Sequence, residues 1–313
     1  MVNSCCCYVI DSGYLFPTLL SAIQARQATT VERTDIKIIC VGHPTDKTCL
    51  FQEICEGCGI QLVLVAPEGI DNMPIMFARF FLCRFLDLHY EAVVYLDADT
   101  QISETLEPLL DVPLQPGRFL AARDPMSVLI DTPARAWRQR RAYFRSIGIP
   151  EQVLHRYCNS GVLRFNRKDW ADISRTALGA SSNHGHALKF PDQDALNIIF
   201  GADYLTMSYK WNFPIFFLNC DFQDFITPRI YHFMSNPRPW DGPFHPWGQK
   251  WHTPYLRLIE TYPQLIDSHR ALSRLNYLKY VVQQRVKYVL ESPLWRTPNV
   301  RERVLRSESE AYI

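Results

Sequence analysis

The sequence carries no excess of charge of either sign, with 33 Lys and Arg residues against 32 Asp and Glu residues among its 313. Nucleic-acid-binding domains usually have a basic surplus, so we expect no nucleic-acid partner. No stretch offers the roughly 18 uninterrupted apolar residues that a membrane-spanning helix needs. No basic segment precedes the first apolar run, so a secretory signal peptide is not expected. These absences predict a protein of the cytoplasm, or of the cytoplasmic face of a membrane.

The ten cysteines form no pattern that predicts disulfides or a complete zinc site. Three of them, Cys5, Cys6 and Cys7, are consecutive in an apolar run that is expected to be a buried strand. The pair Cys55-x-x-Cys58 has the spacing of half a zinc site, but no second pair matches it. We therefore expect reduced thiols that serve as packing residues, which fits a reducing compartment.

Hydrophobic residues make up 47% of the chain and charged residues 21%, as in globular proteins generally. By the usual size of about 100–200 residues per domain, this length gives one large domain or two smaller ones. In the first hundred residues, apolar runs alternate with segments of helical periodicity, which predicts an α/β domain with a buried parallel sheet. The expected strands are Cys5–Ile10, Ile36–Val41, Ile60–Val65 and Ala92–Leu96, and the expected helices are Leu15–Ala28, Thr48–Glu56 and Met76–Leu88.

After residue 100 the pattern is looser. We expect further strands at Arg118–Arg123, Gly161–Asn166 and Arg229–Phe233, helices at Ala134–Ile147, Arg167–Leu178 and Pro191–Phe200, and a polar break at Ser181–Gly185. The helix Ala134–Ile147 carries five arginines, which either form a solvated face or bind an anionic acceptor or lipid. From about residue 254, Lys and Arg are interleaved with aliphatic residues and tyrosines along Leu256–Leu265 and Ser273–Leu290.

Two aspartates, Asp97 and Asp99, directly follow the apolar strand that ends at Leu96. Residues i and i+2 of an extended chain point the same way, and ligands of parallel sheets bind beyond the carboxyl ends of the strands. Two carboxylates there can grip one divalent cation, whereas burying them without a cation would be costly. The alternative is a solvated turn that caps the next helix. His232, at another strand end, would add an imidazole suited to Mn²⁺, although a single His in such a place is usually structural.

Two more polar clusters, Asn159-Ser160-Gly161 and Asp192-Gln193-Asp194, flank apolar runs. Taken singly, they are typical of a turn and of a helix start. The order of all these motifs along residues 5–240 resembles glycosyltransferase family 8, which includes glycogenin and bacterial lipopolysaccharide galactosyl- and glucosyltransferases. The matching segments are Asp11-x-x-Tyr14, Arg79, Tyr95-Leu96-Asp97-Ala98-Asp99, Asn159-Ser160-Gly161-Val162, Asp192-Gln193-Asp194-x-x-Asn197 and His232-Phe233-x-x-x-x-Arg238-Pro239-Trp240.

The resemblance implies an α/β, GT-A fold, the Rossmann-like fold of nucleotide-diphospho-sugar transferases, with a mixed central sheet. Residues 1–253 would form the catalytic domain and residues 254–313 a helical C-terminal extension. The implied reaction is the retaining transfer of a hexose, glucose or galactose, from a UDP-sugar with Mn²⁺ or Mg²⁺. The acceptor would be a saccharide or lipid-linked saccharide of bacterial lipopolysaccharide or capsule synthesis.

The resemblance also assigns roles to residues at the metal and at the nucleotide. The metal ligands would be Asp97, Asp99 and His232. Asp11 would contact the uracil and Tyr14 would stack on it. The residues implied at the diphosphate or the donor sugar are Arg79, Ser235, Arg238, Asn159, Ser160, Asp192 and Asp124, the last of which contacts either donor or acceptor.

The resemblance leaves the course of the retaining reaction open. Gln193 would lie on the β face of the anomeric carbon, where a nucleophile or a stabilising group must be. If a covalent intermediate forms, Asp192 or Asp194 would be its nucleophile. In the other course, the leaving phosphate oxygen accepts the acceptor's proton on the same face of the sugar. Arg79 would assist in either course.

Two positions depart from the family pattern H-F-x-G-x-x-K-P-W. Ser235 stands in place of the Gly, which loses freedom at positive φ but keeps the backbone N–H. Arg238 stands in place of the Lys, which keeps the charge but presents a planar fork instead of a point. We expect diphosphate binding to survive both changes.

Other interpretations concern the class of protein and the C-terminal segment. A haloacid-dehalogenase-type phosphatase also has a carboxylate pair after a strand, but its D-x-D-x-T/V motif lies near the N-terminus and Thr100 comes one position too early. A catalytically weak sugar-nucleotide-binding scaffold of a polysaccharide assembly complex would differ from an enzyme in turnover. The basic and aromatic segment 254–313 would dock on an anionic membrane surface, pack as an ordinary helix, or mediate self-association.

Overall fold

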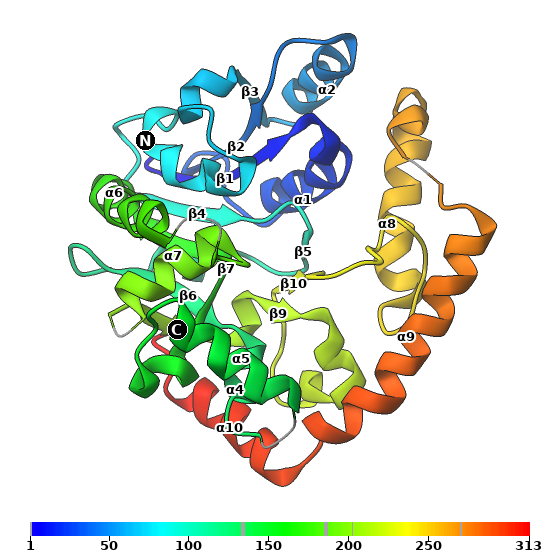
Figure 1. Cartoon of the computed structure of the whole chain (residues 1–313). Coiled ribbons are helices and arrows are strands. Elements are labelled where there is room, and N and C mark those ends of the chain that lie inside the picture. Colours follow the sequence, from blue (N-terminus) through cyan, green and yellow to red (C-terminus); the bar gives the residue numbers. More distant parts are fainter. Residues whose placement is uncertain (1, 133–134, 185–186, 202, 270) are drawn as a thin grey trace.

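The computed structural model describes residues 2–132, 135–184, 187–201, 203–269 and 271–313, and its core is one sheet with helices on both faces (Figure 1). The seven strands of this sheet follow the order β3-β2-β1-β4-β7-β6-β8. Their bounds are Ser4–Asp11 for β1, Thr34–Val41 for β2, Gln61–Val65 for β3, Ala92–Leu96 for β4, Phe119–Arg123 for β6, Cys158–Asn166 for β7 and Leu205–Met207 for β8.

Strands β1 to β4 are parallel, as the alternating pattern predicted. Side chains of β1 alternate between two hydrophobic cores on opposite faces of the sheet, so the strand is buried on both sides. The intervening helices are α1 (Leu15–Gln27) and α2 (Asp46–Gly57). The ten cysteines are all free thiols and most are buried, which confirms their packing role.

The helix expected over Met76–Leu88 is present as a 3₁₀ helix, η3, over Ile75–Arg84, so it ends four residues earlier than predicted. A 3₁₀ helix turns more tightly, with i to i+3 hydrogen bonds. The backbone carbonyl of Arg79 accepts a hydrogen bond from Trp170 Nε1 at 2.9 Å, which ties this segment to the helix that follows β7.

The other half of the sheet is not parallel. Strand β7 runs antiparallel to both β4 and β6, and β8 runs parallel to β6. Strand β7 also begins earlier than expected, so Asn159 and Ser160 lie inside a strand and not in a turn. The side chain of Asn197 explains this, because it pairs with both backbone groups of Cys158, at 2.6 Å to the N–H and 2.9 Å to the carbonyl.

A second, three-stranded sheet has the order β5-β10-β9, with β5 at Thr100–Ile102, β9 at Phe213–Pro214 and β10 at Ile230–His232. The sequence did not indicate β5 or β9. Strand β10 pairs antiparallel with β5, so that His232 lies opposite Thr100. The backbone N–H of Phe233 donates to the carbonyl of Asp99 at 2.9 Å. This small sheet therefore brings residue 232 beside the segment that follows β4.

The helices of the second half are α3 (Glu107–Leu110), α4 (Pro125–Val128), α5 (Arg135–Ser146), α6 (Arg167–His184) and α7 (Pro191–Phe200). Helix α7 has the predicted bounds. The polar break predicted at Ser181–Gly185 is wrong for residues 181–184, because helix α6 continues through them. The Ser182 hydroxyl donates a hydrogen bond to the carbonyl of Leu178 at 3.0 Å. Ala134 and Gly185, which fell in predicted elements, lie outside the described residues.

Three helices follow the small sheet: α8 (Gly248–Thr261), α9 (Arg274–Trp295) and α10 (Pro298–Ser309). The expected boundary after residue 253 falls inside α8, whose Trp251 and Tyr255 are buried in the main core. Helix α9 runs along the outside of the molecule, and α10 returns to the β6 half (Figure 1). The N–H of Tyr312 bonds to the carbonyl of Thr206 on β8 at 2.8 Å. Among the described residues, no helix is both long and apolar enough to cross a membrane.

Candidate functional site

A pocket of 260 Å³ opens at the carboxyl ends of β1 and β4, where the parallel half of the sheet meets the small sheet. Its lining includes many of the residues that the sequence motifs singled out. The residues around it are Val9, Ile10, Asp11, Tyr14, Ile75, Met76, Arg79, Tyr95, Asp97, Ala98, Asp99 and Arg238. The topology thus gathers segments from four distant parts of the chain at one sheet edge.

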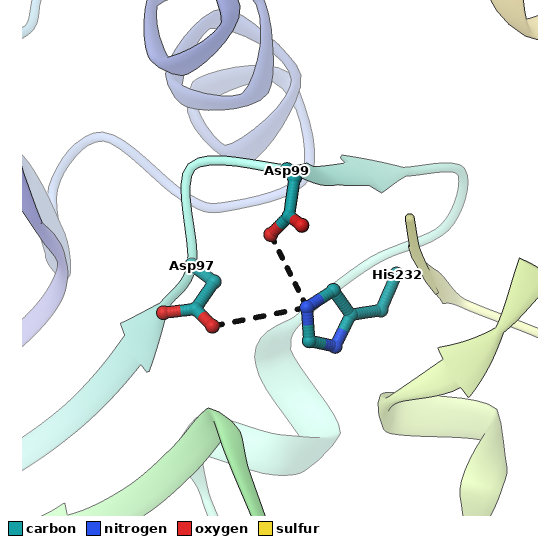
Figure 2. A group of neighbouring side chains, drawn as sticks. All are labelled: Asp97, Asp99 and His232. Carbon is teal, nitrogen blue, oxygen red and sulfur yellow. Dashed lines mark ion pairs between the residues drawn. The ribbon is translucent and has the colours of Figure 1, made fainter. Parts of the chain in front are cut away.

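The three predicted metal ligands, Asp97, Asp99 and His232, meet at this edge of the sheet (Figure 2). The ring nitrogen Nε2 of His232 lies 3.2 Å from Oδ1 of Asp99 and 3.7 Å from Oδ2 of Asp97. One ligand atom from each residue lies within 4.8 Å of the others, and no second group of this kind occurs among the described residues. Cys55 and Cys58, which have the spacing of half a zinc site, belong to no such group among the described residues. The donor set of two carboxylates and one imidazole suits Mn²⁺.

Gly161 on β7 leaves the room that this cluster needs. A Cβ atom at this position would come within 2.2 Å of Cε1 of His232 and 2.9 Å of Oδ2 of Asp97. Neither approach is sterically possible without moving the ligands. The absence of a side chain at residue 161 therefore lets the imidazole and the carboxylate converge.

Two arginines, the buried Arg79 and the partly buried Arg238, neutralise the carboxylates. Arg79 contacts Asp97 with Nη2 to Oδ1 at 3.1 Å, and Arg238 contacts Oδ2 of Asp99. Burial alone would raise the pKa of Asp99, but Arg238 and His232 hold it well below the usual range. Burial would likewise lower the pKa of His232, yet Asp99 and Asp97 raise it above its usual value. Without a metal, the two guanidinium groups and a proton on His232 therefore balance the charge of both carboxylates.

Arg79 also links this cluster to α7. Its Nε lies 3.1 Å from Oδ2 of Asp192, and its Nη1 donates to the carbonyl of Ser160 at 2.6 Å. The hydroxyl of Ser160 donates to the same oxygen of Asp192 at 2.8 Å. Burial would lower the pKa of Arg79, but Asp192, Tyr95 and Asp97 raise it, so the guanidinium stays charged.

Gln193 lies beside these groups with its amide fully engaged. Its Oε1 accepts from the N–H of Ser160 and from Nδ2 of Asn159, both at 3.1 Å. Its Nε2 donates to Oδ2 of Asp124 at 3.1 Å. Burial raises the pKa of Asp124, whose Oδ1 also caps α4 through the N–H of Met126. The structure thus brings together Asn159, Ser160 and Gln193 with Asp124, as the motifs led us to expect of residues that share one site.

The structure places Asp194 differently from its neighbours in the motif. Its carboxylate accepts from Tyr157 at 2.6 Å, from the N–H of Phe190 at 2.9 Å, and from Tyr143. The side chain is fully buried and does not line the pocket. Asp194 thus anchors the start of α7, and Asp192 is the aspartate of this motif that contacts the pocket residue Arg79.

The opposite wall holds Asp11 and Tyr14. Asp11 is the last residue of β1, and its Oδ1 accepts from the N–H of Gly13 at 2.8 Å. The ring of Tyr14 is 43% exposed and meets Trp240 edge to face, with centroids 6.4 Å apart. An exposed ring at a pocket wall can stack on a planar ligand. Ser235 is exposed in the loop after β10 and is not a lining residue of the pocket.

Sequence reasoning missed two polar residues of the site. Tyr95 donates its hydroxyl to Oδ1 of Asp97 at 2.7 Å, and Arg79 packs on its ring. Asn212 lies between two predicted site residues, His232 and Asn159. Tyr95 belongs to the matching segment Tyr95-Leu96-Asp97-Ala98-Asp99, but neither the strand pattern nor the resemblance gave it a role of its own. Asn212 follows a segment without periodicity, so no local pattern marked it.

Comparison with known proteins relates this arrangement to a family. The model of the family described as "Glycosyl transferase family 8" matches residues 5–243. A lipopolysaccharide 1,2-glucosyltransferase of Escherichia coli (strain K12) is 27% identical over 230 residues, which are 69% of this chain and 61% of that protein. The lipopolysaccharide glucosyltransferase WaaO of the same strain is 28% identical over 207 residues, 60% of this chain and 56% of that protein. The chain therefore spans less than two thirds of these relatives.

Solved structures share the fold at lower identity. The galactosyltransferase LgtC in complex with donor and acceptor sugar analogs has a TM-score of 0.59 at 20% identity, with 88% of this chain and 99% of that chain covered. An active-site mutant of LgtC has a TM-score of 0.64 at 18% identity, with 81% and 95% covered. At these identities the likeness concerns the fold alone. The fold is GT-A with a mixed central sheet and C-terminal helices, as expected.

Proposed function

Because this chain belongs to glycosyltransferase family 8, we propose that it transfers a glucose or galactose residue from a UDP-sugar to a saccharide acceptor, with retention of the anomeric configuration. The observation that carries the proposal is the meeting of Asp97, Asp99 and His232 at the pocket edge. The similarity of this chain to two lipopolysaccharide glucosyltransferases supports a hexose donor and a role in lipopolysaccharide or capsule synthesis.

The metal is Mn²⁺, or Mg²⁺ in its place, held by Asp97, Asp99 and His232. The fit rests on the donor set, on ligand atoms within 4.8 Å of one another, and on the space that Gly161 leaves beside them. When bound, the ion acts as a Lewis acid that neutralises charge on the departing diphosphate. Arg238 adds a second, permanent positive charge at the same place.

The nucleotide occupies the pocket between the two walls. Tyr14 stacks on the uracil, and Asp11 accepts a hydrogen bond from it. Tyr14 is suited to this role because its ring is exposed at the pocket wall. Ser235 contributes its backbone N–H, which is the donor that the Gly of the family pattern would offer at this position.

The donor sugar lies against β7 and the start of α7. Arg79, Asn159 and Asp192 hold its hydroxyls, with Ser160 orienting Asp192 through its own hydroxyl. Gln193 lies on the β face of the anomeric carbon, and Asp124 fixes its amide. Asp192 is the carboxylate within reach of a sugar in a covalent course. Asp194 is a positioning residue, because both of its oxygens are occupied by Tyr143, Tyr157 and a backbone N–H.

The acceptor approaches from the side of α5. Arg140 of this basic helix packs over the ring of Phe190 at 5.1 Å, directly before α7. Phe190 is exposed. A saccharide can stack on such a ring while the arginine meets a polar or anionic group of the acceptor.

Helix α9 docks the protein on the cytoplasmic surface of an anionic membrane, where a lipid-linked acceptor would be found. The helix exposes a stripe of aliphatic side chains on one face: Leu275, Leu278, Val282, Val286 and Val289. Basic residues accompany the stripe at Arg274, Lys279, Arg285 and Lys287. An apolar stripe with basic neighbours is typical of helices that lie in a lipid interface.

Release of UDP tests the proposal. The protein is incubated with a panel of UDP-sugars, first with Mn²⁺ and then with EDTA, without an acceptor, because many glycosyltransferases slowly hydrolyse their donor. Metal-dependent release from one sugar supports the enzyme and identifies its donor, and Asp99→Asn should abolish it. Full activity of Asp99→Asn would refute the assignment of the site. The alternative, a sugar-nucleotide-binding scaffold, predicts metal-dependent UDP binding without release, with or without a saccharide acceptor.

A further inference from the structure

A chain of side-chain amides connects the imidazole of His232 to the residues at the start of α7. The ring nitrogen Nδ1 of His232 lies 2.8 Å from Oδ1 of Asn212. The amide nitrogen of Asn212 donates to Oδ1 of Asn159 at 2.9 Å. The amide nitrogen of Asn159 in turn donates to Oε1 of Gln193 at 3.1 Å and to Oδ2 of Asp124 at 3.3 Å.

The direction of every hydrogen bond in this series of side chains is fixed by groups that can only donate or can only accept. The N–H of Gly161 can only donate, and it meets Oδ1 of Asn159 at 3.0 Å. Oδ2 of Asp124, which also accepts from Nε2 of Gln193, meets Nδ2 of Asn159. Rotating the Asn159 amide would set its nitrogen against a donor and its oxygen against an acceptor. The orientation of Asn159 is therefore determined.

This orientation propagates to His232. Because Oδ1 of Asn159 is an acceptor, Asn212 must offer its nitrogen there and its oxygen to the imidazole. The imidazole must then carry its proton on Nδ1, the atom that faces Oδ1 of Asn212. The lone pair of the neutral ring is left on Nε2, which lies between Asp97 and Asp99.

The side chains of this hydrogen-bonded series are buried, so water does not take the place of a lost partner. His232, Asn212, Asn159, Gln193 and Asp124 are all more than nine-tenths buried. A partner lost from such a network leaves a buried polar group unsatisfied, which disturbs the remaining members.

We infer that Asn212 is a positioning residue with two separable tasks. Its oxygen fixes the tautomer and the ring orientation of His232 for metal binding, and its nitrogen fixes Asn159 and, through it, Gln193 at the donor sugar. The inference rests on the proposed function. Metal ligation by histidine commonly depends on such a partner of the other ring nitrogen, and its removal typically costs about 10–100-fold in metal affinity.

Two substitutions separate the tasks. Asn212→Leu removes both the acceptor for His232 and the donor for Asn159. Asn212→Asp keeps an oxygen for the Nδ1 proton but places a second oxygen against Oδ1 of Asn159. The control is Asn219→Leu, which removes another buried amide, one whose oxygen has no hydrogen-bond partner in the part of the chain that the structure describes. The melting temperature of each variant reports whether it folds.

The readout is the Mn²⁺ concentration that gives half-maximal binding of radiolabelled UDP in equilibrium dialysis. For Asn212→Leu we expect this concentration to rise by about 10–100-fold, whereas Asn212→Asp and Asn219→Leu should stay within about threefold of the wild type. A second readout is UDP release at saturating Mn²⁺, where Asn212→Asp should fall at least about tenfold in kcat while Asn219→Leu is unchanged.

Wild-type Mn²⁺ dependence in folded Asn212→Leu would overturn the inference and leave the proposed function intact. A loss in Asn212→Asp equal to that in Asn212→Leu would overturn the separation of the two tasks. UDP binding by the wild type without any need for Mn²⁺ would refute the proposed metal site, and the inference with it.

Discussion

Arg238 donates a hydrogen bond from Nη1 to Oδ2 of Asp99, while Oδ1 of the same carboxylate lies 3.2 Å from Nε2 of His232. One carboxylate thus faces a guanidinium on one side and the candidate metal position on the other. Although burial would raise the pKa of Asp99, Arg238 and His232 lower it, so this carboxylate stays ionised even without a metal. In the proposed function, the same guanidinium would meet the diphosphate of the donor.

The first prediction concerns this charge. Arg238→Ala should weaken Mn²⁺-dependent UDP binding by about 10–100-fold, because a hydrogen bond to a charged group contributes about 1.5–3 kcal/mol. Arg238→Lys should stay within about fivefold of the wild type, since a positive charge remains. Calorimetric titration with UDP measures both. Equal affinities for the Ala variant and the wild type would show that Arg238 does not reach the diphosphate.

The second prediction concerns the space beside the metal ligands. Gly161→Ala should raise the Mn²⁺ requirement for UDP binding at least about tenfold and destabilise the fold by about 1–3 kcal/mol, because its methyl group overlaps His232. The matched control is Gly179→Ala on α6, where no atom of the described residues outside the helix's own backbone lies within 4 Å of the added atom. That variant should bind normally and melt at the same or a higher temperature. Normal Mn²⁺ dependence of Gly161→Ala would contradict the convergence of the three ligands.

The third prediction concerns pH. The folded, metal-free protein holds a proton on His232 to higher pH than the unfolded chain, since Asp99 and Asp97 raise the pKa of that ring against its burial. This proton stabilises the metal-free fold below about pH 6.5, the unfolded pKa, and the stabilisation is lost as the pH rises through the folded pKa. Mn²⁺ needs the unprotonated ring, so its affinity changes in the opposite direction.

Melting temperatures with Mn²⁺ and with EDTA, compared at about pH 6 and about pH 8.5, check this prediction. The difference between the two temperatures should widen at the higher pH in the wild type. In His232→Ala it should be small and nearly independent of pH. A difference that narrows as the pH rises would exclude His232 as a ligand.

The fourth prediction concerns the exposed stripe of α9. Replacing Leu278, Val282 and Val289 together by Glu should abolish co-sedimentation with vesicles that contain anionic lipid, because charged groups resist entry into the lipid interface. UDP release in solution should be unchanged. The control is Val31→Glu, at a residue as exposed as Val282 but on the loop between α1 and β2. Undiminished sedimentation of the triple variant would exclude this face as the membrane contact.

Sequence reasoning went furthest where a local pattern and a chemical motif coincide. The run Val93-Val94-Tyr95-Leu96 predicted a buried strand, and the aspartates behind it therefore had to lie at a sheet edge. Helix α7 followed equally directly from Pro191 and the acidic first turn. The place of His232 at a strand end made it a possible ligand, and the family resemblance assigned it that role and added the mixed sheet.

Long-range contacts set the limit of that reasoning. Asn159 and Ser160 were assigned to a turn because they are polar, whereas the amide of Asn197 completes a strand around them. Asp194 has the same motif as Asp192, yet two tyrosines from other segments turn it away from the pocket. The partners of Asn212 lie on two other elements, β7 and β10, so its own neighbourhood in the sequence carries no signal.

The most direct test of the central claim is the binding of UDP to the purified protein by calorimetry, with Mn²⁺ and with EDTA. It requires neither the right sugar nor the right acceptor. The account predicts binding that is at least about tenfold tighter with Mn²⁺, and no such gain in Asp97→Asn, Asp99→Asn or His232→Ala. Equal binding with Mn²⁺ and EDTA, or a full gain in those variants, would contradict the assignment of the metal and nucleotide site.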